Sequence, residues 1–303
     1  MDAQVLVLRG VRQLGWETRL LPPPGPGDVL VSTLLSAVSV ASELSLVEGR
    51  VATPFPRPLG YQTLGLVEAA GAGAGLLPGQ RVVTMSGHVS AAVLNAERCL
   101  AVPDHIPDRM ALAAVLGEET CKGIRLVAPA ADDRVLVAGA GLLGLLTVFN
   151  LTRRGVREVT VLEPDPERRE LARAFGAHTV APGEEIRRDF DVGFECSASP
   201  EGFGELLSRL RPRGRACVIS DGNWGRLTLP PAFHERELQL VASSDGEDYH
   251  GYAGWLWAHP EPLLVKLFEV TVELSGLIGM FARLRRFPRP VSVVADWSAR
   301  LHG

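Results

Sequence analysis

The sequence has few cysteines, and none of them form a pair at metal-binding spacing. The four are widely separated along the chain: Cys99, Cys121, Cys196 and Cys217. A disulfide framework or a structural zinc knuckle needs cysteines at short, regular spacing. This pattern argues against both and is typical of reduced thiols.

An excess of one charge and a membrane-length apolar run are also missing. The 31 basic and 35 acidic residues give a net charge of −4, so there is no basic surplus to neutralise a nucleic-acid backbone. The amino terminus lacks the basic and apolar regions of a secretory signal. The longest apolar stretch, 135–151, contains three glycines and is shorter than the ~20 residues of a membrane span. We therefore expect a cytoplasmic protein without nucleic-acid or membrane partners.

The chain's pattern changes near residue 115. The first hundred or so residues contain short β segments separated by proline and glycine, whereas later residues alternate apolar strands with amphipathic helices. The second pattern is typical of a parallel sheet covered by helices on both faces. We predict an α/β protein with a β-rich domain at 1–115, a nucleotide-binding domain at 116–248, and a segment at 249–303 that returns to the first domain.

Four β-α steps are visible in the second domain. The apolar segment 135–141 precedes a helix over 142–154, and the strand 159–164 precedes a helix over 166–177. Asp165 is suited to cap that second helix, Pro166 to its first position, and Gly176 to its C-terminus.

A glycine motif follows the first of these strands. Gly139, Gly141 and Gly144 form a G-x-G-x-x-G pattern that opens the next helix, the context in which this motif binds dinucleotides. The first glycine permits a tight turn, the second leaves room for pyrophosphate, and the third allows close packing of helix and strand. The phosphates then meet the N–H groups of Leu142 and Leu143 at the helix start.

An acidic residue ends the second strand. Glu163 lies 22 residues beyond Gly141, where its carboxylate can accept hydrogen bonds from the adenosine ribose. Its negative charge opposes a 2′-phosphate, although Arg168 and Arg169 can offset that charge. We therefore predict NAD, with NADP less favoured. Cys196 and Ser220, in the two following strands, are further candidates for cofactor contact.

Three segments resemble the medium-chain dehydrogenase/reductase superfamily. They are the segments 24–39 and 60–83 and the glycine unit beginning at residue 135. The resemblance implies a GroES-like β-rich catalytic domain, made from both chain ends, and a Rossmann domain. The stretch from Ser39 to Gly49 and the short length look most like the bacteriochlorophyllide a dehydrogenase subgroup, whose members oxidise a secondary alcohol with NAD. A homo-oligomer, a dimer in the simplest case, is expected from the resemblance alone.

The zinc ligands of the metal-dependent members are replaced here. Ser39 takes the place of a cysteine, Tyr61 that of a histidine and Gln62 that of a glutamate, and the four-cysteine structural lobe is missing. Neutral hydroxyls are poor zinc ligands beside thiolate and imidazole. We predict no catalytic and no structural zinc.

Hydroxyl groups must then supply the proton transfer that accompanies hydride transfer. By resemblance, Tyr61 and Ser39 occupy the former ligand positions and Ser42 matches the proton-relay hydroxyl. Tyr61 and Ser42 are the candidates for the group bonded to the reacting oxygen. The alternative is that Tyr61 is only an aromatic wall.

Glu118, His88 and a late aromatic group have two interpretations each, and Glu43 has one. Glu118 lies, by resemblance, beside the nicotinamide and can act as an acid or base, or it can form an ion pair with Lys122 one turn later. Glu43 is expected to orient the site. His88 can be catalytic, but a solvated loop histidine is the favoured interpretation. A late aromatic group either lines a flat pocket or fills core and interface: Trp224, Tyr249, Tyr252, Trp255 and Trp257.

The predicted function is interconversion of a secondary alcohol and a ketone on a small molecule, and a biosynthetic role is open. A second possibility is reduction of an activated C=C bond, as in zinc-free quinone and enoyl reductases, although their preference for NADPH argues against it. A third is a catalytically silent cofactor-binding protein. The substrate does not follow from the sequence.

Overall fold

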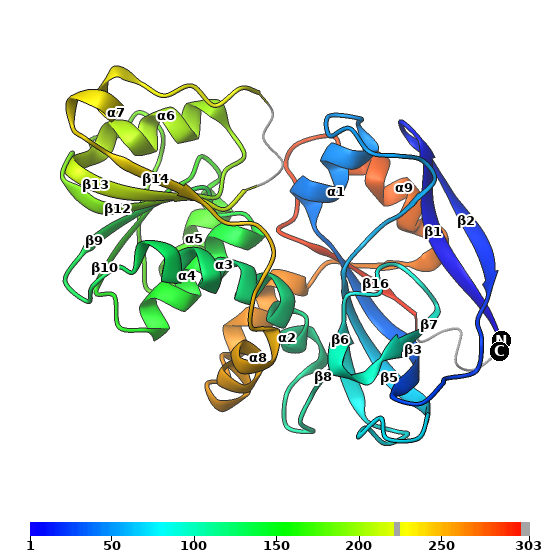
Figure 1. Cartoon of the computed structure of the whole chain (residues 1–303). Helices are drawn as coiled ribbons and strands as arrows, with labels where there is room; N and C mark the ends of the chain where they lie inside the picture. The colour runs from blue at the N-terminus through cyan, green and yellow to red at the C-terminus, as the bar shows by residue number, and fades with distance from the viewer. Residues whose placement is uncertain (221–224, 298–303) are drawn as a thin grey trace. The chain divides into compact units, whose positions relative to one another are not determined.

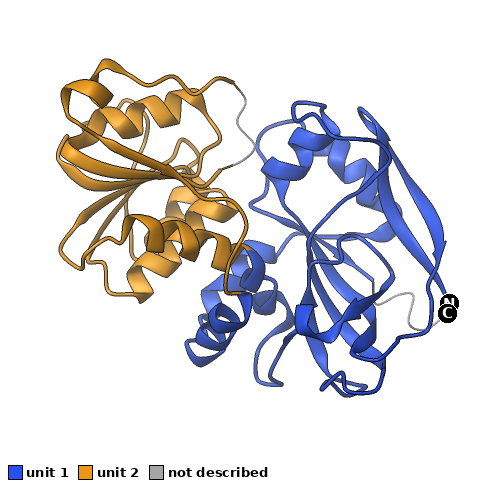
Figure 2. Ribbon diagram, in the orientation of Figure 1, with its two compact units in different colours: residues 1–115, 249–303 blue, residues 116–248 orange. Residues whose placement is uncertain are grey.

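The computed structural model describes residues 1–220 and 225–297, which divide into two compact units. Unit 1 contains residues 1–115 and 249–303, and unit 2 contains residues 116–248. Figure 1 labels the helices and strands, and Figure 2 colours the two units separately.

Unit 1 is built on antiparallel strands. A three-stranded sheet has the order β2-β1-β4, and a seven-stranded sheet has the order β15-β16-β3-β5-β6-β8, with β7 also paired to β3. The strands are β1 (Asp2–Gly10), β2 (Gln13–Leu20), β3 (Asp28–Val38), β4 (Arg57–Pro58), β5 (Gln62–Ala70), β6 (Arg81–Thr84), β7 (Ala91–Asn95), β8 (Leu100–Ala101), β15 (Thr271–Glu273) and β16 (Val293–Asp296). The strand β16 pairs with β3, so residues 293–296 belong to the same seven-stranded sheet as residues 28–38.

The helices of unit 1 are short. They are α1 (Val40–Val47), η1 (Ala96–Arg98), α2 (Asp108–Ala111), α8 (Tyr249–Ala258), η2 (Pro262–Phe268) and α9 (Leu274–Arg283). The core beside α1 and α9 joins residues from both chain ends, including Leu8, Val47, Phe281 and Trp297. This packing holds α1, which contains the predicted catalytic Ser42 and begins after Ser39, against the sheet.

Unit 2 is a six-stranded parallel sheet with the order β11-β10-β9-β12-β13-β14. The strands are β9 (Arg134–Ala138), β10 (Glu158–Leu162), β11 (His178–Val180), β12 (Phe190–Glu195), β13 (Leu210–Val218) and β14 (Gln239–Ala242). The order reverses between β9 and β12, and ligands of such sheets bind outside the carboxyl ends of the strands at this switch point.

The helices of unit 2 are α3 (Ala113–Val127), which starts in unit 1, and α4 (Leu142–Arg153), α5 (Pro166–Ala174), α6 (Pro200–Arg209) and α7 (Pro231–Glu235). Two of these helices, α5 and α6, begin at residues whose side chains cap them. Asp165 accepts hydrogen bonds from the N–H groups of Glu167 and Arg168, and Gly176 has a φ of +96° just past the end of α5. The predicted caps of α5 are confirmed.

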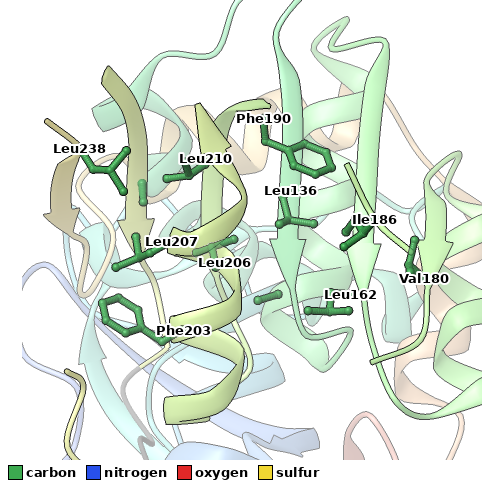
Figure 3. Packing of buried hydrophobic residues seen from close by; sticks show 12 residues of the cluster. Leu136, Leu162, Val180, Ile186, Phe190, Phe203, Leu206, Leu207, Leu210 and Leu238 are labelled. Atoms are coloured by element: carbon green, nitrogen blue, oxygen red, sulfur yellow. The ribbon is translucent and has the colours of Figure 1, made fainter. Parts of the chain in front are cut away.

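One face of the unit 2 sheet packs against α6. Figure 3 shows Phe203, Leu206 and Leu207 of this helix lying against the apolar side chains of the strands. Leu206 is fully buried, and its side chain lies so close to β12 that a Cβ on Gly193 would be 3.0 Å from it. The fit leaves little room for relaxation at this point.

The predicted fold class is confirmed. The antiparallel sheets of unit 1 and the parallel sheet of unit 2 form the α/β combination expected from the sequence, a GroES-like part and a Rossmann part. Within the described residues, no helix is both long enough and apolar enough to cross a membrane.

Leu206→Ala should lower the free energy of unfolding by about 2–5 kcal/mol, because tightly packed surroundings cannot fill the cavity. Gly204→Ala in the same helix is the matched control, since a Cβ there meets no atom within 4 Å. It should raise stability by about 0.4–1 kcal/mol. Urea unfolding measures both, and equal effects of the two changes would contradict the packing described for α6.

Candidate functional site

Three predicted catalytic hydroxyls meet at the start of α1. Ser39 is the N-cap residue of this helix, and its Oγ donates to Ser42 Oγ at 3.3 Å. Tyr61, just before β5, donates from its Oη to the same oxygen at 3.4 Å. Ser42 Oγ therefore accepts a hydrogen bond from each of the other two hydroxyl groups. Both oxygen–oxygen distances are long for hydroxyl pairs.

The donor set of this hydroxyl cluster (Ser39, Ser42 and Tyr61) does not fit zinc. Its atoms are neutral hydroxyl oxygens, and the next residue, Gln62, adds a neutral amide. Zinc in proteins is held by thiolate, imidazole or carboxylate. Across the part of the chain that the structure describes, no group of three or more such side chains is placed to hold a metal ion.

Gln62 is buried without a hydrogen-bond partner. Its side chain is 1% exposed, and neither the amide oxygen nor the amide nitrogen has a partner within residues 1–220 and 225–297. The neighbouring Thr63 is also buried, but its Oγ1 donates to the Gly87 carbonyl at 2.9 Å. Because successive strand residues point to opposite faces, Gln62 shares the Ala37 side of the sheet and Thr63 the Ser36 side.

The favoured interpretation of His88 as a solvated loop residue is wrong. Its side chain is 0% exposed, with Nε2 3.0 Å from Glu43 Oε2 and Nδ1 2.8 Å from Ser36 Oγ. A Cβ on Gly60 would lie 2.8 Å from the backbone nitrogen of His88, so the loop packs this closely only because residue 60 is glycine. In the sequence, the glycines at positions 60 and 87 were the signal for this close packing. In the structure both have a positive φ.

Glu118 is an ion-pair residue, but its partner is not Lys122. The fully buried carboxylate receives two hydrogen bonds from Arg125, at 2.7 and 3.1 Å, and accepts the backbone N–H groups of Glu247 and Asp248. These side-chain hydrogen bonds raise the pKa of the Arg125 guanidinium. Lys122 instead donates to the Ser244 carbonyl and lies 3.4 Å from Glu247. This geometry favours the structural role over the acid or base role.

The glycine motif of unit 2 has a separate geometry at each position. Gly139 has a φ of +91°, in the left-handed region. A Cβ on Gly144 would lie 1.9 Å from the Gly139 carbonyl oxygen, whereas a Cβ on Gly141 would meet no atom within 4 Å. The turn, the close helix packing and the open position therefore fall where the motif predicts them. Leu142 and Leu143 form the first turn of α4, whose N–H groups have no partner within the helix.

Glu163 lies at the predicted sheet edge but is bound to the glycine loop. It is 4% exposed, and its Oε2 accepts the Ala140 N–H at 2.6 Å while Oε1 accepts the Asp165 N–H at 2.9 Å. A carboxylate has about four acceptor sites, so further hydrogen bonds remain available. Arg169 donates to the carbonyls of Glu163 and Pro164, and the half-buried Arg168 lies in the first turn of α5.

The other predicted cofactor residues lie near a carboxylate that the sequence analysis missed. Cys196 is buried, which raises the pKa of its thiol, and its Sγ is 3.6 Å from Thr147 Oγ1. Ser220 donates to Glu195, a fully buried residue that also accepts the Ser197 N–H at 2.7 Å. The signal for Glu195 was an acidic residue at the end of an apolar strand, at the switch point of the sheet.

The late aromatic residues are mostly packed around α8. Tyr252 is buried and lies 5.5 Å from Trp255, which stacks on His259, and Trp257 donates to the Ala101 carbonyl. Trp224 lies outside the described residues. The contacts of α8 favour the structural interpretation of these rings.

Comparison with known proteins shows relatives along the whole chain. No protein-family model matches the sequence. The 2-desacetyl-2-hydroxyethyl bacteriochlorophyllide A dehydrogenase of Cereibacter sphaeroides is 29% identical, and the alignment covers 99% of each chain.

Solved structures share the fold. A provisionally assigned zinc-binding dehydrogenase of Sinorhizobium meliloti 1021, bound to NADP, has a TM-score of 0.86 at 18% identity, covering 98% of this chain and 99% of that one. An alcohol dehydrogenase of Escherichia coli CFT073, in complex with NADH, has a TM-score of 0.81 at 18% identity, covering 97% and 99%. At 18% identity, these two structures show that the chain shares the fold of the two dehydrogenases.

Proposed function

We propose that this protein is a zinc-independent, NAD(H)-dependent oxidoreductase that interconverts a secondary alcohol and a ketone on a small molecule. The observation that carries the proposal is the glycine turn of unit 2, which is open at Gly141 and closely packed at Gly144. The relatives support its coarser part, because one is named a dehydrogenase of a hydroxyethyl bacteriochlorophyllide and two solved neighbours hold NADH and NADP respectively. A homo-oligomer stays a prediction.

The residues of unit 2 fit a nicotinamide dinucleotide. Pyrophosphate would lie over Gly141 and accept hydrogen bonds from the N–H groups of Leu142 and Leu143. The positive end of the helix dipole favours an anion there. Glu163 would accept the adenosine ribose hydroxyls with the lone pairs that Ala140 and Asp165 leave unused. When bound, the nicotinamide supplies the hydride acceptor or donor.

The hydroxyl cluster of unit 1 fits the accompanying proton transfer. Ser42 accepts a hydrogen bond from both Ser39 and Tyr61, so three hydroxyl groups lie together at the start of α1. A hydroxyl donor stabilises the negative charge that develops on a substrate oxygen and can pass a proton to it. We propose that Ser42, or Tyr61 in its place, contacts the reacting oxygen.

The unpartnered amide of Gln62 fits a role in ligand binding. Leaving a buried polar group without a hydrogen bond costs about 1–3 kcal/mol, so a folded chain rarely keeps one without a use. An amide presents both a donor and an acceptor, which match the oxygen of a ketone and the hydroxyl of an alcohol respectively. We propose that Gln62 hydrogen-bonds a polar group of the substrate.

Gly141→Ala should weaken NAD⁺ binding by about tenfold or more, because its Cβ enters the space of the pyrophosphate. It should leave the unfolding midpoint nearly unchanged, since no atom lies within 4 Å. Gly144→Ala should instead lower the unfolding midpoint, because its Cβ meets the Gly139 carbonyl. Calorimetric titration and thermal unfolding measure the two effects. Wild-type affinity in Gly141→Ala would exclude this loop as the cofactor site.

Glu163→Gln should reduce the preference for NAD⁺ over NADP⁺ by about tenfold, or roughly 1.4 kcal/mol, because it removes a negative charge that repels a 2′-phosphate. Glu167→Gln, on the exposed first turn of α5, is the control and should leave the ratio of the two dissociation constants unchanged. If the ratio in Glu163→Gln equals that of the wild type, Glu163 does not set the cofactor preference.

Gln62→Leu should raise the free energy of unfolding by about 1–3 kcal/mol, because it removes an unsatisfied buried amide. The same change should lower kcat/KM with any secondary alcohol that the wild type oxidises. Thr63→Val is the matched control and should lower stability by about 1 kcal/mol, since it removes a satisfied hydrogen bond. A Gln62→Leu protein less stable than the wild type would show that the amide already has a partner.

A further inference from the structure

His88 and Glu43 are two almost completely buried titratable groups of unit 1. Their side chains are 0% and 1% exposed, and the backbone of His88 is fixed by hydrogen bonds from its N–H to Leu59 and from the Leu6 N–H to its carbonyl. A buried acid and a buried imidazole are costly unless every polar atom is hydrogen-bonded. The positions of their protons can therefore be derived from a complete account of their partners.

Five side chains or backbone groups form one hydrogen-bonded chain. The Trp297 indole N–H lies 2.9 Å from Ser36 Oγ, and Ser36 Oγ lies 2.8 Å from His88 Nδ1. His88 Nε2 lies 3.0 Å from Glu43 Oε2, and the Ser39 N–H donates to Glu43 Oε1 at 2.8 Å. This series of hydrogen bonds thus connects Trp297, the last described residue, to Ser39, the N-cap residue of α1.

The Trp297 indole N–H sets the direction of the hydrogen bonds that follow it. An indole N–H can only donate, so Ser36 Oγ must accept from Trp297. The Ser36 hydroxyl proton then needs an acceptor, and His88 Nδ1 is the other partner that the structure gives to this oxygen. Were Nδ1 protonated, the buried hydroxyl proton would be left without an acceptor, at a cost of about 1–3 kcal/mol.

We infer that His88 is a neutral imidazole protonated at Nε2, and that with Glu43 it positions the hydroxyl cluster at the start of α1. His88 donates to Glu43, and Glu43 in turn holds the backbone of Ser39. Ser39 Oγ donates a hydrogen bond to Ser42 Oγ, which also accepts one from Tyr61 Oη. The catalytic part of this inference rests on the proposed function, whereas the proton positions do not.

The geometry makes His88 and Glu43 positioning residues. Glu43 Oε1 accepts the backbone N–H of Ser39, so this contact fixes the start of α1 and passes no proton to the Ser39 hydroxyl. A displacement of about 1 Å at a reacting group can cost ~100-fold in rate, so loss of this support should lower kcat more than it changes KM.

Nitrogen-15 NMR of the histidine-labelled, full-length wild-type protein tests the proton positions directly. We expect the His88 ring to show a protonated Nε2 and an unprotonated Nδ1, with the signal assigned through ring correlations and its loss in His88→Gln. A protonated Nδ1, or protons on both nitrogens, would overturn the inference. This result needs neither substrate nor cofactor, so it stands apart from the proposed function.

Kinetics of three variants test the positioning role, with a secondary alcohol that the wild type oxidises. His88→Leu should lower kcat by ~10–100-fold with little change in KM or in NAD⁺ affinity. His88→Gln, whose amide can still donate to Glu43, should recover part of that loss. His105→Leu, on an exposed loop of the same unit, should behave as the wild type. Equal kcat values in His88→Leu and the wild type would overturn the positioning role, even with NAD⁺ binding intact.

Discussion

The structure depends on keeping four buried carboxylates hydrogen-bonded. Glu43, Glu118, Glu163 and Glu195 are each no more than 4% exposed. An ionised carboxylate in an apolar interior is strongly unfavourable unless donors surround it. Each of these four accepts at least one backbone N–H group from a turn or helix start. Each buried carboxylate thereby fixes the position of the loop or helix start whose N–H group it accepts.

The loops fixed in this way are the ones that carry the proposed chemistry. Glu163 holds Ala140, in the middle of the glycine motif, and Glu195 holds the turn after the neighbouring strand β12. Glu43 holds Ser39, where the hydroxyl cluster begins. The same arrangement explains why acids in this chain were hard to assign, since a buried carboxylate that shapes a loop and one that binds a ligand look alike in sequence.

Local patterns predicted unit 2 well. The glycine motif, the Asp165 cap and the alternation of strands with helices depend on residues close in sequence, and the structure follows them. The misassignments involve distant contacts. His88 is buried because Ser36 and Glu43, about 50 and 45 residues earlier, come from another strand and a helix. Glu118 pairs with Arg125, two helical turns away, because the longer fork of arginine reaches it while Lys122 turns to Ser244.

Two departures from sequence expectation lie in the part of unit 1 that carries the candidate chemistry. Gln62 is buried without a hydrogen-bond partner among the described residues, and His88 is buried rather than solvated. Natural chains break such expectations mainly at functional sites, where a ligand or a fixed geometry compensates. Gln62 follows Tyr61 directly in the chain, which supports the proposal that the hydroxyl cluster handles the substrate.

The most direct test of a metal-free hydroxyl site is the NAD⁺-dependent oxidation of secondary alcohols by protein whose metal content has been measured before and after treatment with a strong chelator. The geometry of Ser39, Ser42 and Tyr61 predicts NADH formation at the same rate in both samples, with less than one equivalent of zinc in either. Activity that disappears with the chelator and returns with added zinc would contradict it.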